Sequence, residues 1–251
     1  MSLIHPATTT KTDAKTALDQ KAQQQDTIIN GNNDATDEEK AKARELVEQA
    51  KTEAKNNINS DHTTIDVNNE KTKGIQKIAE IHPATTVKSN AKQELQNKAD
   101  DQIAQITNTP NATQEDKQDA ITEVNTSLAQ PNQNINQAHS TEEVKRAKGD
   151  GINSINDIHA KVNKKQSAIN ELKQKANEQK QLILANNNAT DDEKNAAQAQ
   201  VDAKLAEEIQ NVNNADTNAQ VDNVKSKANT AISAINAQPH KRQDAINSLI
   251  A

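Results

Sequence analysis

Residues 81–86 read Ile81-His82-Pro83-Ala84-Thr85-Thr86, and residues 4–9 read Ile4-His5-Pro6-Ala7-Thr8-Thr9, letter for letter the same. The interval from Ile4 to Ile81 is 77 positions, and a looser copy begins one interval later at Ile158. Self-similarity at a fixed interval is the signature of a repeat protein. It predicts three tandem units and the truncated first helix of a fourth, over residues 4–80, 81–157, 158–234 and 235–251.

A second marker keeps the same interval. Three threonines, each shortly after an Asn-rich stretch, lie 77 positions apart: Thr36, Thr113 and Thr190. Thr36 with Glu39 and Thr190 with Glu193 fit the capping box of a helix N-terminus, and Thr113 with Asp116 is a weaker version of it. We therefore expect the second helix of each unit to begin after these threonines. Further polar clusters near residues 60–64, 140–141 and 216–217 predict the start of the third helix.

Apolar residues recur in the same columns when the units are aligned. In the first unit one set is Ala14, Leu18, Ala22 and Ile29, with steps of 4, 4 and 7 that define one face of a helix. The columns that start at Ala43 and Val67 have the same helical spacing. Each unit is therefore expected to contain three helices of about 18–24 residues.

Composition alone leaves a disordered chain as an alternative, because only 32% of residues are hydrophobic. The helical spacing of the apolar columns favours folded helix. The chain contains no aromatic residue and no cysteine, and its net charge is −6. Base stacking, phosphate neutralisation and disulfides therefore have no support, and we expect no nucleic-acid partner. No apolar run reaches membrane length, so no membrane contact is expected. Met1-Ser2-Leu3 resembles an added leader, which suggests an excised piece of a longer protein.

An up-down-up bundle of three helices takes its chain in at one end and releases it at the other. The predicted fold class is therefore all-α, with tandem three-helix bundles strung end to end into an elongated rod. Contacts are expected mainly with neighbouring repeats of the same chain. We expect a monomer.

Several residues depart from the regular pattern. Gly74 and Gly151 fall inside the third helix, where the last unit has Ala228. A close helix contact is the preferred explanation, and a hinge is the alternative. Pro131 is expected to kink or split the second helix of its unit.

The ends of the third helices differ in sequence. Pro6 and Pro83 are expected to stop the preceding helix, whereas the third unit has Ala160 in that column. This difference predicts a continuous helix across residues 157–163 and a stiffer joint there than at Pro83.

Some polar groups invite a functional reading. Five histidines suggest a metal site or a pH switch, although exposed polar residues at helix ends explain them better: His5, His62, His82, His139 and His159. The acidic runs 37–39, 115–116 and 191–193 lack the glycine of a calcium loop and fit the first turn of a helix. Lys164-Lys165 and Lys241-Arg242 are expected to be solvated helix starts. We assign no catalytic, cofactor-binding or metal-binding residue, expect no cofactor and predict that the chain is not an enzyme.

The sequence also resembles a known family. The segments IHPATTVKSNAKQELQNKADDQIAQI (81–106), NDATDEEKAKAR (33–44) and VDNVKSKANTAISAI (221–235) are similar to the domain-of-unknown-function repeats of giant cell-wall-anchored staphylococcal surface proteins. This resemblance covers residues 4–251. It implies an extracellular location on the bacterial surface, attachment to the cell wall, and a stalk that projects an adhesive region in cell aggregation or biofilm. Ala160 and Pro131 depart from the pattern.

Two functions follow as hypotheses. The first is a structural stalk or spacer that supports adhesion, aggregation or biofilm, and hence virulence. The alternative is a weak multivalent binding module for host matrix or plasma proteins, or for the same protein on another cell. Binding hot spots are usually rich in Trp, Tyr and Arg, and this chain has no aromatic residue, so strong one-to-one binding is disfavoured. A hydrolase or other cell-wall enzyme is the least favoured class.

Overall fold

A computed structural model describes residues 8–250, without the side chains of residues 241–243. The described part contains helices and no strand, which confirms the all-α fold class. The chain forms two compact units, Met1–Asp100 with Ser127–Ile155 and Asp101–Thr126 with Asn156–Ala251. In chain order the helices are α1 (Thr8–Asn30), α2 (Asp37–Ser60), α3 (Thr64–Ala79), α4 (Thr86–Thr107), α5 (Gln114–Ser127), α6 (Ala129–Gln137), α7 (Thr141–Asn156), α8 (Asn163–Leu184), α9 (Asp191–Asn214), α10 (Asn218–Ser233) and α11 (His240–Ile250).

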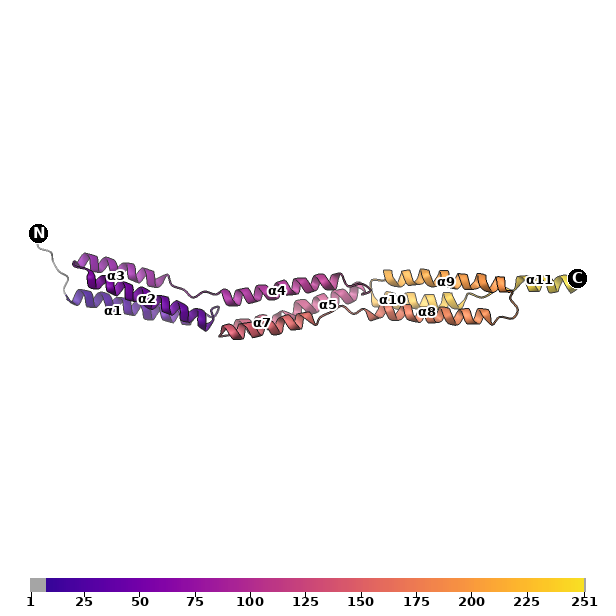
Figure 1. Ribbon diagram of the computed structural model, residues 1–251, viewed down its shortest axis with the longest axis horizontal. Coiled ribbons are helices and arrows are strands. Elements are labelled where there is room, and N and C mark those ends of the chain that lie inside the picture. Colours follow the sequence, from indigo (N-terminus) through magenta and orange to yellow (C-terminus); the bar gives the residue numbers. More distant parts are fainter. Residues whose placement is uncertain (1–7, 251) are drawn as a thin grey trace. The chain divides into compact units, whose positions relative to one another are not determined.

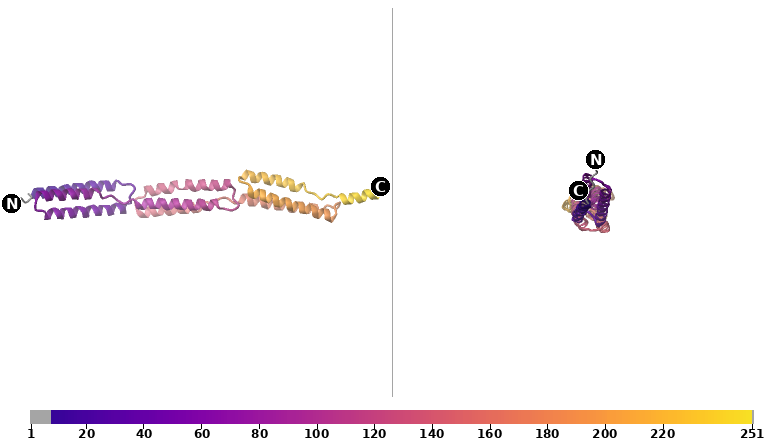
Figure 2. Two further views of the ribbon diagram at one scale, coloured as in Figure 1. Left: turned by 90° about the horizontal axis from the view of Figure 1, so that it is seen from above. Right: turned by 90° about the vertical axis from the view of Figure 1, so that its left-hand side faces the viewer.

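The first three helices form a three-helix bundle. Each of α1, α2 and α3 packs against the other two, and the three lie side by side in both views of the molecule (Figures 1 and 2). The Lys11 ammonium donates to the Asn59 carbonyl, so the start of α1 lies beside the end of α2. The Gln25 amide donates to the Ile81 carbonyl, so the ends of α1 and α3 also lie together. The chain therefore enters this bundle at one end and leaves it at the other.

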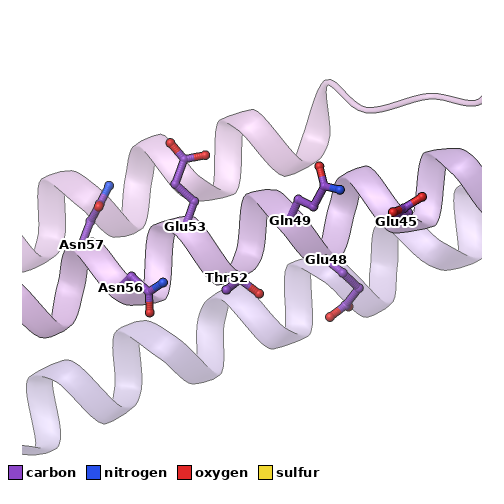
Figure 3. Close-up of a pocket in the computed structure, with 7 residues that line it drawn as sticks. All are labelled: Glu45, Glu48, Gln49, Thr52, Glu53, Asn56 and Asn57. Carbon is purple, nitrogen blue, oxygen red and sulfur yellow. The ribbon is translucent and has the colours of Figure 1, made fainter.

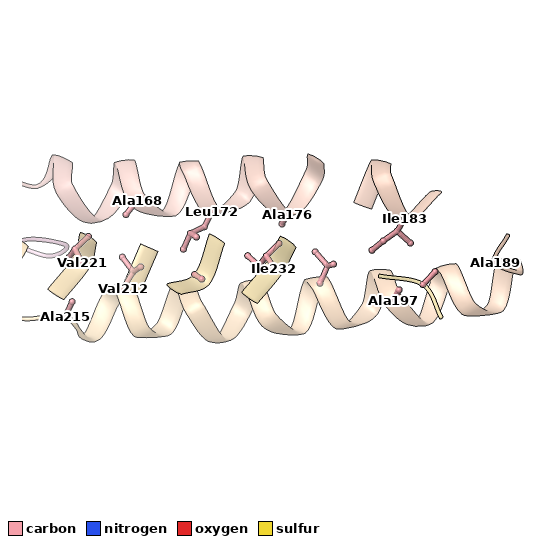
Figure 4. Packing of buried hydrophobic residues seen from close by; sticks show 13 residues of the cluster. Ala168, Leu172, Ala176, Ile183, Ala189, Ala197, Val212, Ala215, Val221 and Ile232 are labelled. Atoms are coloured by element: carbon pink, nitrogen blue, oxygen red, sulfur yellow. The ribbon is translucent and has the colours of Figure 1, made fainter. Parts of the chain in front are cut away.

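The helices α8, α9 and α10 form an equivalent bundle, in which each again packs against the other two. Its core contains no aromatic ring and consists of Leu, Ile, Val and many Ala side chains. Figure 4 shows Leu172 and Ile183 pointing from α8 toward the other two helices. The matching core of α1–α3 is built from the predicted columns, with Leu18, Val47, Ile58 and Ile78 fully buried. Alanine lets the helices approach closely but buries little area per residue.

The helix starts follow the predicted caps. Thr36 and Thr190 form complete capping boxes with Glu39 and Glu193. Thr113 accepts from the backbone N–H of Asp116 at 3.0 Å. The third helices begin after caps at residues 63, 140 and 217. These third helices have 16 residues each, so the expected length of 18–24 is wrong for them.

Pro131 splits its helix, as predicted. The helix α5 ends at Ser127, four residues before Pro131, and α6 begins at Ala129. A proline has no N–H to donate to the carbonyl four residues earlier, and its ring crowds that carbonyl. The corresponding helices α2 and α9 are continuous over 24 residues.

The prediction of a continuous helix across residues 157–163 is wrong. The helix α7 ends at Asn156, and helical structure resumes at Asn163. The third helices end at equivalent residues, Ala79, Asn156 and Ser233, although only the first is followed by a proline in the Pro83 column. Proline is therefore not what ends them. The prediction for Pro6 lies outside the described residues.

A buried glutamine accounts for these shared ends. Gln25, Gln102 and Gln179 are 77 positions apart, and each has at most 2% of its surface exposed. Their side-chain amides donate to the carbonyls of Ile81, Ile158 and Ile235 at 2.7–2.8 Å. Since this bond holds the chain after each third helix in the same place, an alanine at position 160 does not extend α7.

Candidate functional site

The connections between successive repeats carry several hydrogen bonds between segments far apart in the sequence. We define the first joint as residues 33–39, 81–88 and 136–141, all in the first compact unit. The second joint is residues 110–116, 158–165 and 213–218, all in the second unit. In each joint the start of a second helix meets the start of the third helix of the next repeat.

In the first joint, the acidic first turn of α2 binds the start of α7. The Asp37 N–H donates to the His139 carbonyl at 2.7 Å. The Glu38 carboxylate accepts from both the backbone N–H and the hydroxyl of Thr141, each at 2.9 Å. The bond from the Thr141 N–H, together with Glu38's own N–H and the Thr141 hydroxyl, lowers the pKa of Glu38 to about 2. A carboxylate is favoured here because the N-terminus of a helix presents unpaired N–H groups and a positive dipole end.

Glu39 binds two helix starts at once. One carboxylate oxygen completes the capping box of α2 by accepting from the Thr36 N–H at 2.9 Å. The other accepts from the N–H groups of Thr86 and Val87, at 2.9 and 3.1 Å, at the start of α4. Burial alone would raise the pKa of Glu39, but the bonds from Thr36, Val87 and Thr86 outweigh it, and the pKa is lowered.

A buried lysine completes the first joint. Lys88 is only 5% exposed, and its ammonium donates to the carbonyls of Asn33 and Asn136 at 2.8 and 2.9 Å. Asn136 lies at the end of α6, where helix carbonyls are unpaired and favour a cation. Burial lowers the pKa of Lys88.

The second joint repeats part of this arrangement. The Glu115 N–H donates to the Asp216 carbonyl at 3.1 Å, and the Glu115 carboxylate accepts from the Asn218 N–H at 2.7 Å. Lys165 is 7% exposed and donates to the Asn213 carbonyl at 2.7 Å. The expectation that Lys164-Lys165 is a solvated helix start is therefore wrong for Lys165. Lys164 pairs with Asp222 at 2.6 Å.

The other residues singled out from the sequence lie apart from one another. The histidines at positions 62, 82, 139 and 159 are exposed, and each lies just outside a helix. His5 and the side chains of Lys241 and Arg242 lie outside the described residues. Among the side chains that the structure describes, no three of the types that commonly ligate metals come together. The acidic runs do occupy first helical turns, as predicted. Sequence reasoning missed the contacts that the runs 37–39 and 115–116 make with the next repeat.

A surface depression on α2 is lined partly by acidic side chains. It is lined by Glu45, Glu48, Gln49, Thr52, Glu53, Asn56 and Asn57, all from this one helix. Figure 3 shows these side chains fanning out to both sides of α2. Glu48 pairs with Lys51, and Glu53 pairs with Lys77. The arrangement is that of a solvated helix surface with ordinary ion pairs.

The joints and bundles together define the class of protein as a tandem array of helical-bundle repeats. The family model described as "Domain of Unknown Function (DUF1542)" matches residues 10–86, 87–163 and 164–240. The chain belongs to this family. No solved structure matches the chain.

Two similar proteins of known name come from Staphylococcus aureus. The chain is 30% identical to the extracellular matrix-binding protein EbhA of Staphylococcus aureus strain Mu3 over 207 aligned residues. These aligned residues make up 82% of this chain and 3% of the relative. The chain is 28% identical over 237 residues to EbhA of strain Newman, which is 94% of this chain and 7% of the relative. The chain thus spans a few per cent of the length of these relatives. Among the described residues, no helix is both long and apolar enough to cross a membrane.

Proposed function

We propose that this chain is a section of a stalk in a bacterial surface protein. The repeats act as a spacer. They hold an adhesive region away from the cell wall to which the full protein is anchored. This role would support cell adhesion, aggregation or biofilm, and so contribute to virulence. The protein would be extracellular, and this section would be a monomer with no catalytic function.

One observation carries the proposal. In the bundle α1–α3 the chain enters at one end and leaves at the other, and the first joint begins where it leaves. The bundle α8–α10 repeats the arrangement, because the Lys165–Asn213 and Gln179–Ile235 hydrogen bonds place its ends in the same way. Repeats of this kind, taken as three-helix units over residues 4–80, 81–157 and 158–234, would add length with each copy.

Small-angle X-ray scattering on the whole chain tests the stalk. Helices of 22–24 residues rise about 1.5 Å per residue, so three bundles in file should span on the order of 100 Å or more. A dilution series provides the control, because a monomer keeps the same maximum dimension at every concentration. A maximum dimension near that of a compact globule of 251 residues, about 50 Å, would refute the proposal.

A second candidate function is weak multivalent binding to host matrix or plasma proteins. The names of the relatives favour it, since they are called extracellular matrix-binding proteins. Partners could include neighbouring copies of the protein on another cell. Surface plasmon resonance against immobilised fibronectin and albumin, with a protein-free surface as the reference, tests this function. Saturable binding that strengthens with repeat number would favour the module, and no response at tens of micromolar would favour the stalk alone.

A further inference from the structure

The third residue after the cap threonine is one of the columns at which the two joints differ. The first joint has Glu39 there, and the second has Asp116, whose side chain is shorter by one methylene. In the first joint, both carboxylate oxygens of Glu39 form hydrogen bonds. One Glu39 oxygen stays on Thr36 of its own repeat while the other reaches Thr86 and Val87 of the next.

Asp116 makes different contacts. One of its oxygens accepts from the Thr113 hydroxyl at 2.8 Å, and the other accepts from the Asn218 side-chain amide at 3.1 Å. Within the part of the chain that the structure describes, no hydrogen bond joins Asp116 to α8. Val162, at the N-cap of α8, has no side chain that could cap the helix, and no such bond is present. The start of α8 therefore lacks the carboxylate that the start of α4 has.

The neighbouring acidic residue is used alike in both joints. Glu38 accepts from the Thr141 N–H, and Glu115 accepts from the Asn218 N–H. The side chains of the two donor residues, Thr141 and Asn218, differ in their hydrogen bonding. The Thr141 hydroxyl is satisfied by Glu38 at 2.9 Å, whereas the amide oxygen of Asn218 is buried without a hydrogen-bond partner. A buried polar atom left unpaired weakens the second joint further.

We propose that the side-chain length at this column determines how firmly one repeat is tied to the next. With glutamate at this column, the second helix of one repeat is tied to two helix starts of the following repeat, that of α4 through Glu39 and that of α7 through Glu38. With aspartate it is tied to one, that of α10, through Glu115 and Asp116. The first joint is then the firm one and the second joint opens more readily, which is the reverse of the order expected from Pro83 and Ala160. This inference concerns the joints and holds whether or not the chain acts as a stalk.

Backbone amide hydrogen exchange on the whole chain, followed by NMR, tests the proposal at both joints. Glu39→Asp should speed exchange of the Thr86 and Val87 amides about tenfold, because they lose their acceptor. Asp116→Glu should slow exchange of the Asn163 and Lys164 amides by a similar factor. The matched control is Glu45→Asp, which makes the same change at an exposed position of the same helix, away from the joint. It should leave all four amides within about twofold of the unsubstituted chain.

A further variant separates the joint from the cap of α2. Thr86→Val keeps the size and branching of the side chain, leaves the capping box intact and removes the hydroxyl that donates to Glu39 at 3.1 Å. Val87 exchange should rise in this variant while exchange of the Val47 amide, in the middle of α2, stays unchanged. Unchanged exchange at residues 86 and 87 in Glu39→Asp would overturn the proposal. So would faster exchange that extends equally to Val47, or an Asp116→Glu chain whose residues 163 and 164 exchange as before.

Discussion

Gly74 lies at a close contact between the helices of the first bundle. A Cβ added there would lie 2.6 Å from the Ala54 Cβ and 2.8 Å from a methyl of Leu18. Gly151 has the equivalent relation to Pro131 and Leu95. The predicted close helix contact is thus confirmed, and the alternative of a hinge is not needed to explain the glycine.

Gly74→Ala should destabilise the chain, although alanine is the better helix former. The overpacking cost is about 1–3 kcal/mol, against a gain in helix propensity of about 1 kcal/mol. Urea unfolding followed by circular dichroism measures the balance. Gly149→Ala is the control, because a Cβ at Gly149 meets nothing within 4 Å, and it should be neutral or stabilising. An unaltered or higher midpoint for Gly74→Ala would show that the contact is not tight.

Asp61 is a second residue with a clear expectation. One of its carboxylate oxygens is buried without a hydrogen-bond partner, and burial and the charges of Asp66 and Glu70 raise its pKa. The other two repeats have alanine in this column, at positions 138 and 215. Asp61→Ala should therefore raise the free energy of unfolding at pH 7 by about 1 kcal/mol. The exposed Asp66→Ala, which removes a charge five residues away but also a cap interaction, should lower it. A destabilised Asp61→Ala chain would contradict this reading.

At the scale of single elements, the sequence predicted the helix starts well and the helix ends poorly. Starts carry a local chemical signal, since a threonine and a carboxylate three residues on satisfy free N–H groups without outside help. The ends of α3, α7 and α10 depend instead on a glutamine 56 positions earlier, as with Gln102 and Ile158. The 77-residue spacing of these glutamines was visible in the sequence. Nothing in their residue type indicated that they are buried.

Gln102→Leu tests the role of that glutamine. Leucine has a similar size but cannot donate, so the Ile158 carbonyl loses its donor at a cost of about 1–3 kcal/mol. Chemical denaturation of the whole chain provides the measurement, and chemical shifts at residues 157–162 report whether α7 lengthens. The exposed neighbour Gln105 serves as the control, and Gln105→Leu should change stability by less than about 0.5 kcal/mol. Wild-type stability in Gln102→Leu would show that another contact holds the chain there.

At the scale of the whole molecule, the interval of 77 residues predicts the repetition, and the helical spacing of the apolar columns predicts the all-α class. Neither pattern predicts the joints. The acidic runs were correctly placed in first helical turns, where the helix dipole explains them, and that local explanation hid their second partner in the next repeat. A lysine at a helix start is usually solvated, but Lys165 is buried and its ammonium donates to the Asn213 carbonyl at the end of α9, a contact that no local pattern indicates. Contacts between distant segments leave no local periodicity to find.

The carboxylates of the first joint make a pH-dependent contribution to stability. The pKa of Glu38 is about 2 in the folded chain, against 4.5 in the unfolded chain, and the pKa of Glu39 is lowered too. Groups with a lowered folded pKa stabilise the fold above the unfolded value and lose that contribution as the pH falls through the folded value. Thermal melts of the chain and of Glu38→Gln should therefore differ most above pH 4.5 and converge by about pH 2. A difference that stays constant over this range would contradict the assignment.

The direction in which the chain crosses its first bundle decides how the bundle bears a mechanical load. Tension applied at the start of α1 and at the end of α3 pulls two parallel helices in opposite directions along their common axis. The buried apolar contacts between the two helices must then break together instead of one at a time. Among them is the contact of the Leu18 side chain with the backbone at Gly74. A bundle loaded in shear resists as a whole until it yields.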